Sequence, residues 1–354
     1  MKIPALQASL PTLLVCALAS AQGDTVTMAN GTVVDGASVK SYTVRELKYT
    51  KGGKSETVAG DQVAGIDLER YRDVYKRSIA NRDAALMLTE SRNQLEKQKD
   101  ELMAQVGYVE CAKLFYSAGD ASSGGQVLEE LQQKLPDAGL IPETYRLKFD
   151  SYMGRGDASG YQNAGIVAKK YATEATTNAW PMGFMLEGEF FVAVADQAAG
   201  GDAQQFQTKM RDVASRAGST YPNLAARANV QLGHSLRLNG NLDGARQLYQ
   251  GVLDNKAASD ETRAGAWLGL GHLAMARGDA ANRDPYREAL LAFLRVKVET
   301  RNSSESLQAE ALYNGMLAAE KWGGEDFRLI QGRCRYLLLN NYANSEWAAR
   351  ARGQ

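Results

Sequence analysis

The chain has only two histidines, and they lie in two similar segments. His234 and His272 each follow a Leu-Gly pair, and a further glycine, Gly240 or Gly278, comes a few residues later. Histidine serves as a general base and as a metal ligand. A zinc site would need at least one more ligand nearby, and no cluster of His, Cys and carboxylates occurs at such spacing. We therefore expect no metal site and no cofactor.

The other reactive side chains are also isolated. Cys111 and Cys334 lie in predicted helices far apart in the chain, so we expect two buried thiols rather than a disulfide, which needs closely spaced Cα atoms. Glu187 and Glu189 could resemble a glycosidase carboxylate pair, but residues two apart on a helix do not face each other. No nucleophile elbow, P-loop or HExxH motif is present. The sequence predicts a non-enzymatic protein without catalytic residues, and a hydrolase with its site between domains remains a third alternative.

Most of the chain reads as pairs of amphipathic helices. Four segments each contain a first helix that ends at a glycine, followed by a second amphipathic helix. The two clearest, 226–259 and 264–299, contain the two histidines, and degenerate copies occupy 178–222 and 306–345. Self-similarity at this period indicates stacked repeats, because one pair cannot bury its apolar face alone.

The repeated pattern of Trp or Tyr, Leu-Gly, an aromatic residue, a turn glycine, then Ala and a second aromatic residue resembles that of tetratricopeptide (TPR) repeats. The resemblance covers roughly 105–350. It implies a mainly α fold: an α-solenoid of about six helix pairs that acts as a scaffold or adaptor and binds a protein or peptide partner on its concave face.

The same resemblance indicates which side chains would meet a partner. At 100° per residue, His234 lies about 200° from Leu232 and so away from the core of its own pair. The stripe that contains it would line the concave face in proteins of this family. The predicted partner-binding residues are Arg227, Val230, His234, Arg237, His272 and Met275. The alternative is that the two histidines only pack between neighbouring first helices.

A small β-rich domain is predicted at 24–67. Asn30-Gly31 is a strong hairpin signal, and residues 43–50 alternate between apolar and polar side chains. Five short strands resemble the small SH3-like or Sm-like barrels that precede helical repeats in some exported bacterial proteins. Such a domain is either a cap and spacer or a peptide- or glycan-binding module. In the second case the protein would be a carbohydrate- or peptidoglycan-associated module of the cell envelope.

The segment 68–104 contains no glycine or proline, and we expect a charged helix that connects the two domains. Leu88, Leu95 and Leu102 keep a seven-residue spacing, which is typical of a coiled-coil seam. The alternative is one long solvated helix that packs back on the first repeat.

The first 21 residues are predicted to be a signal peptide. An apolar run from Leu10 to Leu18 precedes Ala19-Ser20-Ala21, with Gln22 as the mature start. Lipoprotein processing, with a lipid anchor at Cys16, is the competing reading. No later segment is long and apolar enough to cross a membrane. Equal numbers of basic and acidic residues, 41 and 41, argue against nucleic acid as a partner. We expect an exported protein of the periplasm or cell envelope.

Overall fold

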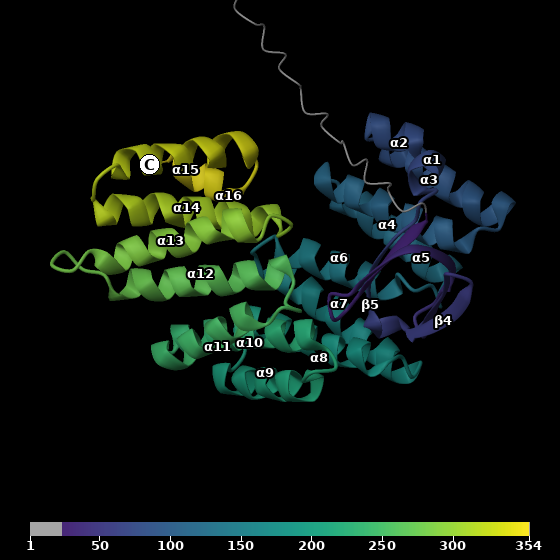
Figure 1. The fold of residues 1–354 in the computed structure, drawn as a ribbon, viewed down its shortest axis with the longest axis horizontal. Coiled ribbons are helices and arrows are strands. Elements are labelled where there is room, and N and C mark those ends of the chain that lie inside the picture. The colour runs from purple at the N-terminus through teal and green to yellow at the C-terminus, as the bar shows by residue number, and fades with distance from the viewer. Residues whose placement is uncertain (1–22, 354) are drawn as a thin grey trace, which may run out of the picture.

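The chain forms a five-stranded antiparallel sheet followed by a long row of helices (Figure 1). This computed structural model describes residues 23–353, so the predicted signal peptide, its cleavage site and Cys16 lie outside the described residues. The fold class is as predicted from the sequence: a mainly α protein with TPR-like helix pairs behind a small β domain. No helix among residues 23–353 is long and apolar enough to span a bilayer.

The sheet has the strand order β4-β3-β2-β1-β5, with every neighbouring pair antiparallel. The ten-residue β2 pairs with β1 through its first half and with β3 through its second half, and bulges in both pairings help it to bend. Val26 in β1 and Leu47 in β3 are fully buried strand residues. The strands are β1 (Asp24–Met28), β2 (Val33–Tyr42), β3 (Glu46–Lys51), β4 (Lys54–Ala59) and β5 (Val63–Asp67), with the short 3-10 turn η1 (Gly60–Gln62) before β5. Closure into a barrel remains a prediction.

The segment 68–104 is not one helix, and the prediction of a single connecting helix is wrong. It is divided into α1 (Tyr71–Val74), α2 (Lys76–Asn81), α3 (Ala84–Asn93) and the π-helical turn η2 (Gln94–Gln98). Arg82 and Lys99 adopt left-handed backbone conformations, and Asp83 and Asp100 then cap α3 and α4 through their side chains. The absence of glycine and proline from 68–104 therefore did not produce one continuous helix, because Asp favours helix starts over helix interiors.

Six helix pairs and a final short helix follow. The first helices of the pairs are α4 (Glu101–Ser117), α6 (Ile141–Met153), α8 (Met182–Ala198), α10 (Pro222–Leu238), α12 (Asp260–Arg277) and α14 (Glu305–Trp322). The second helices are α5 (Ala121–Lys134), α7 (Ala158–Thr177), α9 (Ala203–Ala217), α11 (Leu242–Asp254), α13 (Asp284–Glu299) and α15 (Phe327–Asn341), and α16 (Glu346–Arg352) ends the row.

The Leu-Gly pairs make room for an aromatic ring of the second helix. A Cβ atom on Gly233 would lie 2.6 Å from the ring of Tyr249, and one on Gly271 would lie 2.3 Å from the ring of Phe293. Both rings are buried. The group that approaches each of these glycines closely is therefore the aromatic side chain of α11 or α13.

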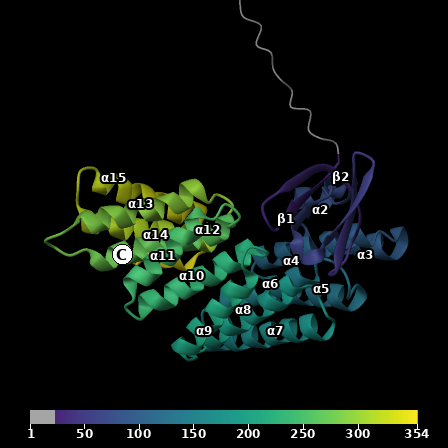
Figure 2. The ribbon, with the colours of Figure 1, turned by 60° about the horizontal axis from the view of Figure 1, so that its bottom comes forward.

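The row of helices bends into an arc (Figure 1). It runs from α1–α4 on the right, through α8–α10 at the bottom, to α14 and α15 on the left. Figure 2 shows the sheet lying over α4 and α6 at the N-terminal end of this arc. A single apolar core extends from Val26 in the sheet to Leu232 in α10, whereas the later helices bury three smaller separate clusters.

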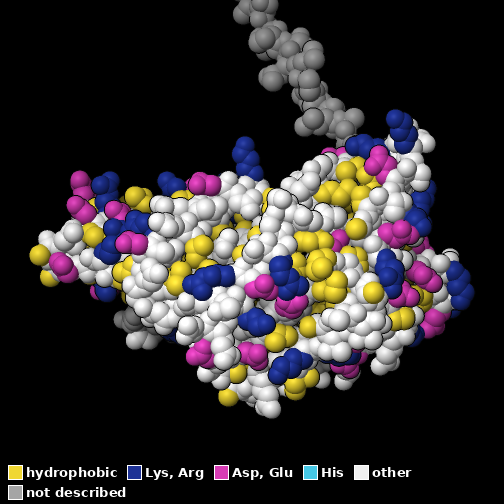
Figure 3. Space-filling view, turned by 90° about the horizontal axis from the view of Figure 1, so that it is seen from below, with side chains coloured by type: hydrophobic (Ala, Val, Ile, Leu, Met, Phe, Trp, Pro, Cys, Tyr) yellow, Lys and Arg dark blue, Asp and Glu magenta, His cyan; other side chains and the backbone are white. Residues whose placement is uncertain are grey.

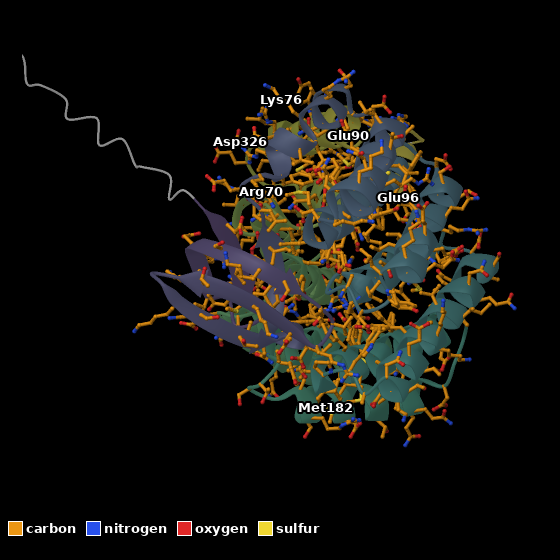
Figure 4. The ribbon with its side chains drawn as sticks, turned by 90° about the vertical axis from the view of Figure 1, so that its right-hand side faces the viewer. Arg70, Lys76, Glu90, Glu96, Met182 and Asp326 are labelled. Atoms are coloured by element: carbon orange, nitrogen blue, oxygen red, sulfur yellow. The ribbon has the colours of Figure 1, made fainter. Side chains whose placement is uncertain are left out.

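The β domain is tied to the helices by its turns. The backbone N–H of Val44 donates to the carbonyl of Asp137 in the α5–α6 loop, at 2.9 Å. The guanidinium of Arg45 donates to the carbonyls of Asn178 and Ala179, just after α7. In the end-on view of Figure 4, Arg70 lies above the sheet and Met182, the first residue of α8, lies below it.

One carboxylate of the β domain completes the start of α8. Asp61 in η1 accepts hydrogen bonds from the backbone N–H of Gly183, at 2.9 Å, and from the hydroxyl of Tyr221, at 2.7 Å. The N-cap of α8, Pro181, supplies no side-chain cap of its own. A carboxylate at a helix N-terminus satisfies free N–H groups and complements the helix dipole. Asp61 therefore couples the sheet to α8 and to the start of α10.

Candidate binding surface

The first helices form the inner face of the arc. Each first helix from α4 to α14 contacts the next first helix, and α14 contacts α16. No comparable contacts join successive second helices in the described part of the chain. Because successive first helices lie closer together than successive second helices, the first helices are on the concave side of the row. In solenoids the concave side is the extended surface that binds partners. We call this surface the inner face.

A ladder of alternating charges crosses the N-terminal part of the inner face. Lys113 on α4 lies 3.9 Å from Glu143 on α6, which lies 3.2 Å from Arg146. Arg146 reaches Glu187 on α8 at 2.8 Å, and Glu187 reaches Arg227 on α10 at 2.6 Å. We call these five residues the charge ladder. It connects four successive first helices without an unpaired charge.

Glu187 is the buried centre of the charge ladder. Its side chain is only 6% exposed, and it accepts hydrogen bonds from Arg146, from Arg227 and from the hydroxyl of Tyr171. Burial alone would raise the pKa of Glu187, but the two guanidinium groups and the Tyr171 hydroxyl hold it at about 2. Glu187 is therefore a charged structural group. Glu189 points elsewhere and pairs with Arg216, so the two acids do not face each other, as expected.

Two of the predicted partner-binding residues, Arg227 and Val230, make their main contacts within the fold. The guanidinium of Arg227 binds Glu187 and lies 4.8 Å from the ring centroid of Phe190. Val230 is 5% exposed and packs beside Gly265 of α12, where an added Cβ would lie 3.1 Å from it. Val230 therefore belongs to the α10–α12 packing and offers almost no surface to a partner.

His234 is held by the second helix of its own pair. Its Nδ1 lies 2.8 Å from the hydroxyl of Tyr249 on α11, and the two rings are 5.5 Å apart. Burial lowers the pKa of His234 to about 4, and electrostatic interactions with Arg237 and His272 act in the same direction. His234 is therefore neutral at pH 7, with one ring nitrogen occupied by Tyr249.

His272 has the same place in the next repeat but a different polar partner. Its ring packs edge-on against Phe293, with centroids 5.4 Å apart. Its Nε2 lies 3.2 Å from Oε1 of Glu310 on α14. Both histidines thus take part in packing around the first helices while keeping an edge at the surface. Met275, one turn further along α12, is half-buried against the same cluster.

Arg237 is the predicted binding residue whose charge is left without a carboxylate. No acidic side chain of the described residues forms an ion pair with it, in contrast to Arg146 and Arg227. Its Nε is buried and has no hydrogen-bond partner among residues 23–353. Arg237 also lies close enough to Tyr249 for its charge to act on the hydroxyl. Composition and spacing gave no sign of this difference between Arg227 and Arg237.

Asp150 on α6 is a further inner-face residue that the sequence did not identify. It is exposed but crowded by neighbouring helices. That desolvation raises its pKa to about 6, against the effect of Arg227, with Glu143 and Glu261 adding to the increase. Glu261 lies at the start of α12.

The remaining candidate groups do not converge. Cys111 and Cys334 are free and buried, and burial raises their thiol pKa values to about 12 and about 11. Residues 23–353 contain no group of three or more His, Cys and carboxylate side chains arranged to hold a metal ion.

A hollow of about 690 Å³ lies between α7 and α8 and is lined mostly by small or apolar residues, with Lys169 and Asp196 among them. Ile166, on the α7 side of this hollow, is 60% exposed. Figure 3 views the molecule from below, the side on which α7 and α9 lie in Figure 2, and shows hydrophobic and charged side chains interspersed there. Lys169 and Asp196 are the two charged residues that line this hollow in the described part of the chain.

Solved structures with helical repeats are similar to this chain at low identity. PilW, a type IV pilus biogenesis factor, gives a TM-score of 0.39 at 14% identity, over 69% of this chain and 96% of that chain. The TPR-like repeats of a putative kinesin light chain from Podosopora anserina give 0.39 at 15%, over 58% and 98%. A human IFIT1 dimer with m7Gppp-AAAA gives 0.35 at 12%, over 77% and 73%. The likeness is one of helical repeats and says nothing about what this chain binds.

No family model matches the sequence, and a search of curated proteins finds no match.

Proposed function

We propose that this protein is a non-enzymatic scaffold that binds a protein or peptide partner on the C-terminal part of its inner face, across α10, α12 and α14. The contact residues in this proposal are His234, Arg237, His272 and Met275. Arg227 and Val230, which the sequence also suggested, are assigned to the internal packing because their contacts are already made within the chain.

The observation that carries the proposal is the contrast along one continuous surface. The charges of α4, α6 and α8 are paired with one another in the charge ladder, whereas Arg237 presents a guanidinium that no described carboxylate neutralises. Buried or half-buried polar groups are normally satisfied within a fold. Arg237 as a whole is only half-buried, so a partner's acceptor can reach the outer part of its guanidinium although the Nε is enclosed.

The β domain is assigned a structural role in this proposal. Its turns donate to the α5–α6 loop and to the end of α7, and Asp61 caps α8. These contacts support a domain that fixes the first helix pairs. A carbohydrate- or peptidoglycan-binding role for the β domain is the alternative that the experiment below separates. Export to the periplasm or cell envelope is proposed from the N-terminal leader pattern alone.

The test is crosslinking of the tagged full-length protein in its native host, followed by identification of the captured molecules. Three forms are compared: wild type, His272→Ala combined with Met275→Ala on the inner face, and Arg287→Gln on the exposed outer surface of α13 as the control. The proposal expects a defined protein that wild type and the control capture and the inner-face variant loses. Capture of cell-wall glycan, or capture of the same protein by all three forms, would contradict it.

A further inference from the structure

Arg237 sits in a cluster that is rich in hydrogen-bond donors. A guanidinium has five N–H donors and no acceptor, and the buried Nε of Arg237 has no acceptor among residues 23–353. Its neighbour Tyr249 is bonded to Nδ1 of His234 at 2.8 Å. A cation beside the Tyr249 hydroxyl favours the orientation in which the oxygen faces Arg237 and the hydroxyl donates to Nδ1 of His234.

This orientation of the Tyr249 hydroxyl determines whether Nε2 of His234 is a hydrogen-bond donor or an acceptor. When Tyr249 donates to Nδ1, the neutral imidazole carries its proton on Nε2, which becomes a donor. Arg237 and His234 therefore both present N–H groups, and neither presents an acceptor. Glu310, which lies further along the inner face on α14, is already bonded to His272. The cluster thus has more donors and more positive charge than the described part of the chain satisfies.

The surroundings of the cluster limit the kind of anion that fits it. The chain has no net charge, and the inner face also carries Asp150 and Glu310. A polyanion such as nucleic acid would be repelled by these acids and would gain little from one guanidinium. Leu238, the next residue on α10, is 75% exposed, and Met275 is half-buried on α12. A single carboxylate beside apolar side chains matches this mixture.

We infer that the partner is a protein segment with an acidic side chain, Asp or Glu, whose carboxylate accepts hydrogen bonds from Arg237 and His234 between α10 and α12, beside an apolar residue that meets Leu238 and Met275. This inference rests on the proposed function and deepens it by naming the partner's chemistry. In this arrangement the partner's carboxylate pairs with Arg237 as Glu187 pairs with Arg227 within the chain itself.

The experiment uses the full chain and three pools of fluorescein-labelled heptapeptides with blocked ends. The central residue is Glu, Gln or phosphoserine, and the flanking positions are random but exclude Asp and Glu. Fluorescence anisotropy measures the binding of each pool to wild type, to Arg237→Gln, and to the outer-surface control Arg287→Gln. The expected result is that wild type and the control bind the Glu pool about tenfold more tightly than the Gln pool, because a charge-assisted hydrogen bond to the guanidinium is gained. Arg237→Gln is expected to bind both pools equally.

Equal binding of the Glu and Gln pools by wild type would overturn the inference, as would a Glu preference that survives in Arg237→Gln. Tighter binding of the phosphoserine pool than of the Glu pool would also overturn it, since the occupant would then be a phosphorylated segment. Failure here is distinguishable from failure of the proposed function. If crosslinking to the partner is lost in the variant with His272→Ala and Met275→Ala while wild type binds the Glu and Gln pools equally, the inner face binds a partner and only the acidic contact is wrong.

Discussion

The two halves of the molecule use the same helix pair in different ways. From the sheet to α10, one continuous core and the charge ladder join every element to its neighbours. From α10 to α16, each unit has its own small core, and the inner face carries Arg237 without an ionic partner. Polar groups that a fold leaves unsatisfied on an accessible surface are better candidates for function than equally polar groups that it pairs. This difference is why the proposed function places the binding surface in the C-terminal half and assigns the N-terminal half a supporting role.

The largest expected effect is on the charge ladder. Glu187→Gln removes the one carboxylate that Arg146 and Arg227 share, and leaving charges partly buried without a counter-ion costs about 3–5 kcal/mol of unfolding free energy. Chemical denaturation of the full chain measures this loss. Glu189→Gln is the matched control, because the exposed Glu189–Arg216 pair contributes at most about 1 kcal/mol. Similar losses for the two variants would contradict a special role for the charge ladder.

The next effect concerns the junction between the β domain and α8. Asp61→Ala removes the acceptor for the Gly183 N–H and the Tyr221 hydroxyl, and leaving such groups unsatisfied costs about 1–3 kcal/mol. Hydrogen exchange is expected to speed up at the start of α8 and in the sheet, and to remain unchanged in α14 and α15. Asp67→Ala, at the exposed end of β5, is the control. Unchanged exchange at α8 would mean that the β domain does not support the helices through Asp61.

Acid is expected to affect the two halves in opposite directions. The folded pKa of His234, about 4, is below its ordinary value of 6.5, so the unfolded state binds more protons and the α10–α12 region loses stability as pH falls from 6.5 to 4. The folded pKa of Asp150, about 6, is above its ordinary value of 3.8, so the native state binds the extra proton and the N-terminal half gains stability as pH falls from 6 to 3.8. Glu187 keeps its charge until the pH approaches 2.

Hydrogen exchange of the backbone amides at pH 7, 5 and 4, corrected for intrinsic rates, measures how acid changes the stability of each half. Protection in α10–α12 is expected to fall while protection in α6–α8 is kept. His234→Gln, which cannot titrate, is expected to remove the loss in α10–α12. A uniform loss of protection in both halves would show that these two groups do not determine the response to pH.

The reaction rates of the two buried thiols report the smallest expected difference between the halves, which is the free energy of local opening. Cys111 lies in the continuous core and Cys334 in the last small cluster, and burial raises both pKa values, so neither thiol reacts readily in the folded state. Labelling with a thiol reagent at pH 7 requires local opening, which costs less in a terminal unit with few neighbours. We expect Cys334 to be labelled roughly tenfold faster than Cys111, as for an opening free energy lower by about 1.4 kcal/mol. Equal rates would show that both halves open together.

The sequence predicted the repeats well because their signals are local. Gly233 and Gly271 occupy the same place in two similar segments, and each is followed by an aromatic residue in the second helix of its pair. The five strands carry ordinary turn residues such as Asn30-Gly31. The broken helices in 68–104 were missed because the stop signals, left-handed Arg82 and Lys99, are not glycines.

The charge ladder and the special position of Arg237 could not be predicted from the sequence. Both depend on which side chains meet across elements that are tens of residues apart, such as Arg146 with Glu187 or His272 with Glu310. On α10, Arg227 and Arg237 occupy the same stripe and are chemically identical. Only the packing shows that one has a carboxylate beside it and the other does not.

The most direct test compares these two arginines in otherwise identical proteins. Arg227→Gln is expected to lower the free energy of unfolding by about 2–3 kcal/mol, since Glu187 loses a charged partner, while the folded variant still binds the Glu peptide pool. Arg237→Gln is expected to change stability by no more than about 0.5 kcal/mol and to lose the preference for the Glu pool. The account is contradicted if Arg227→Gln abolishes the preference in the folded protein, or if Arg237→Gln destabilises the chain and leaves the preference intact.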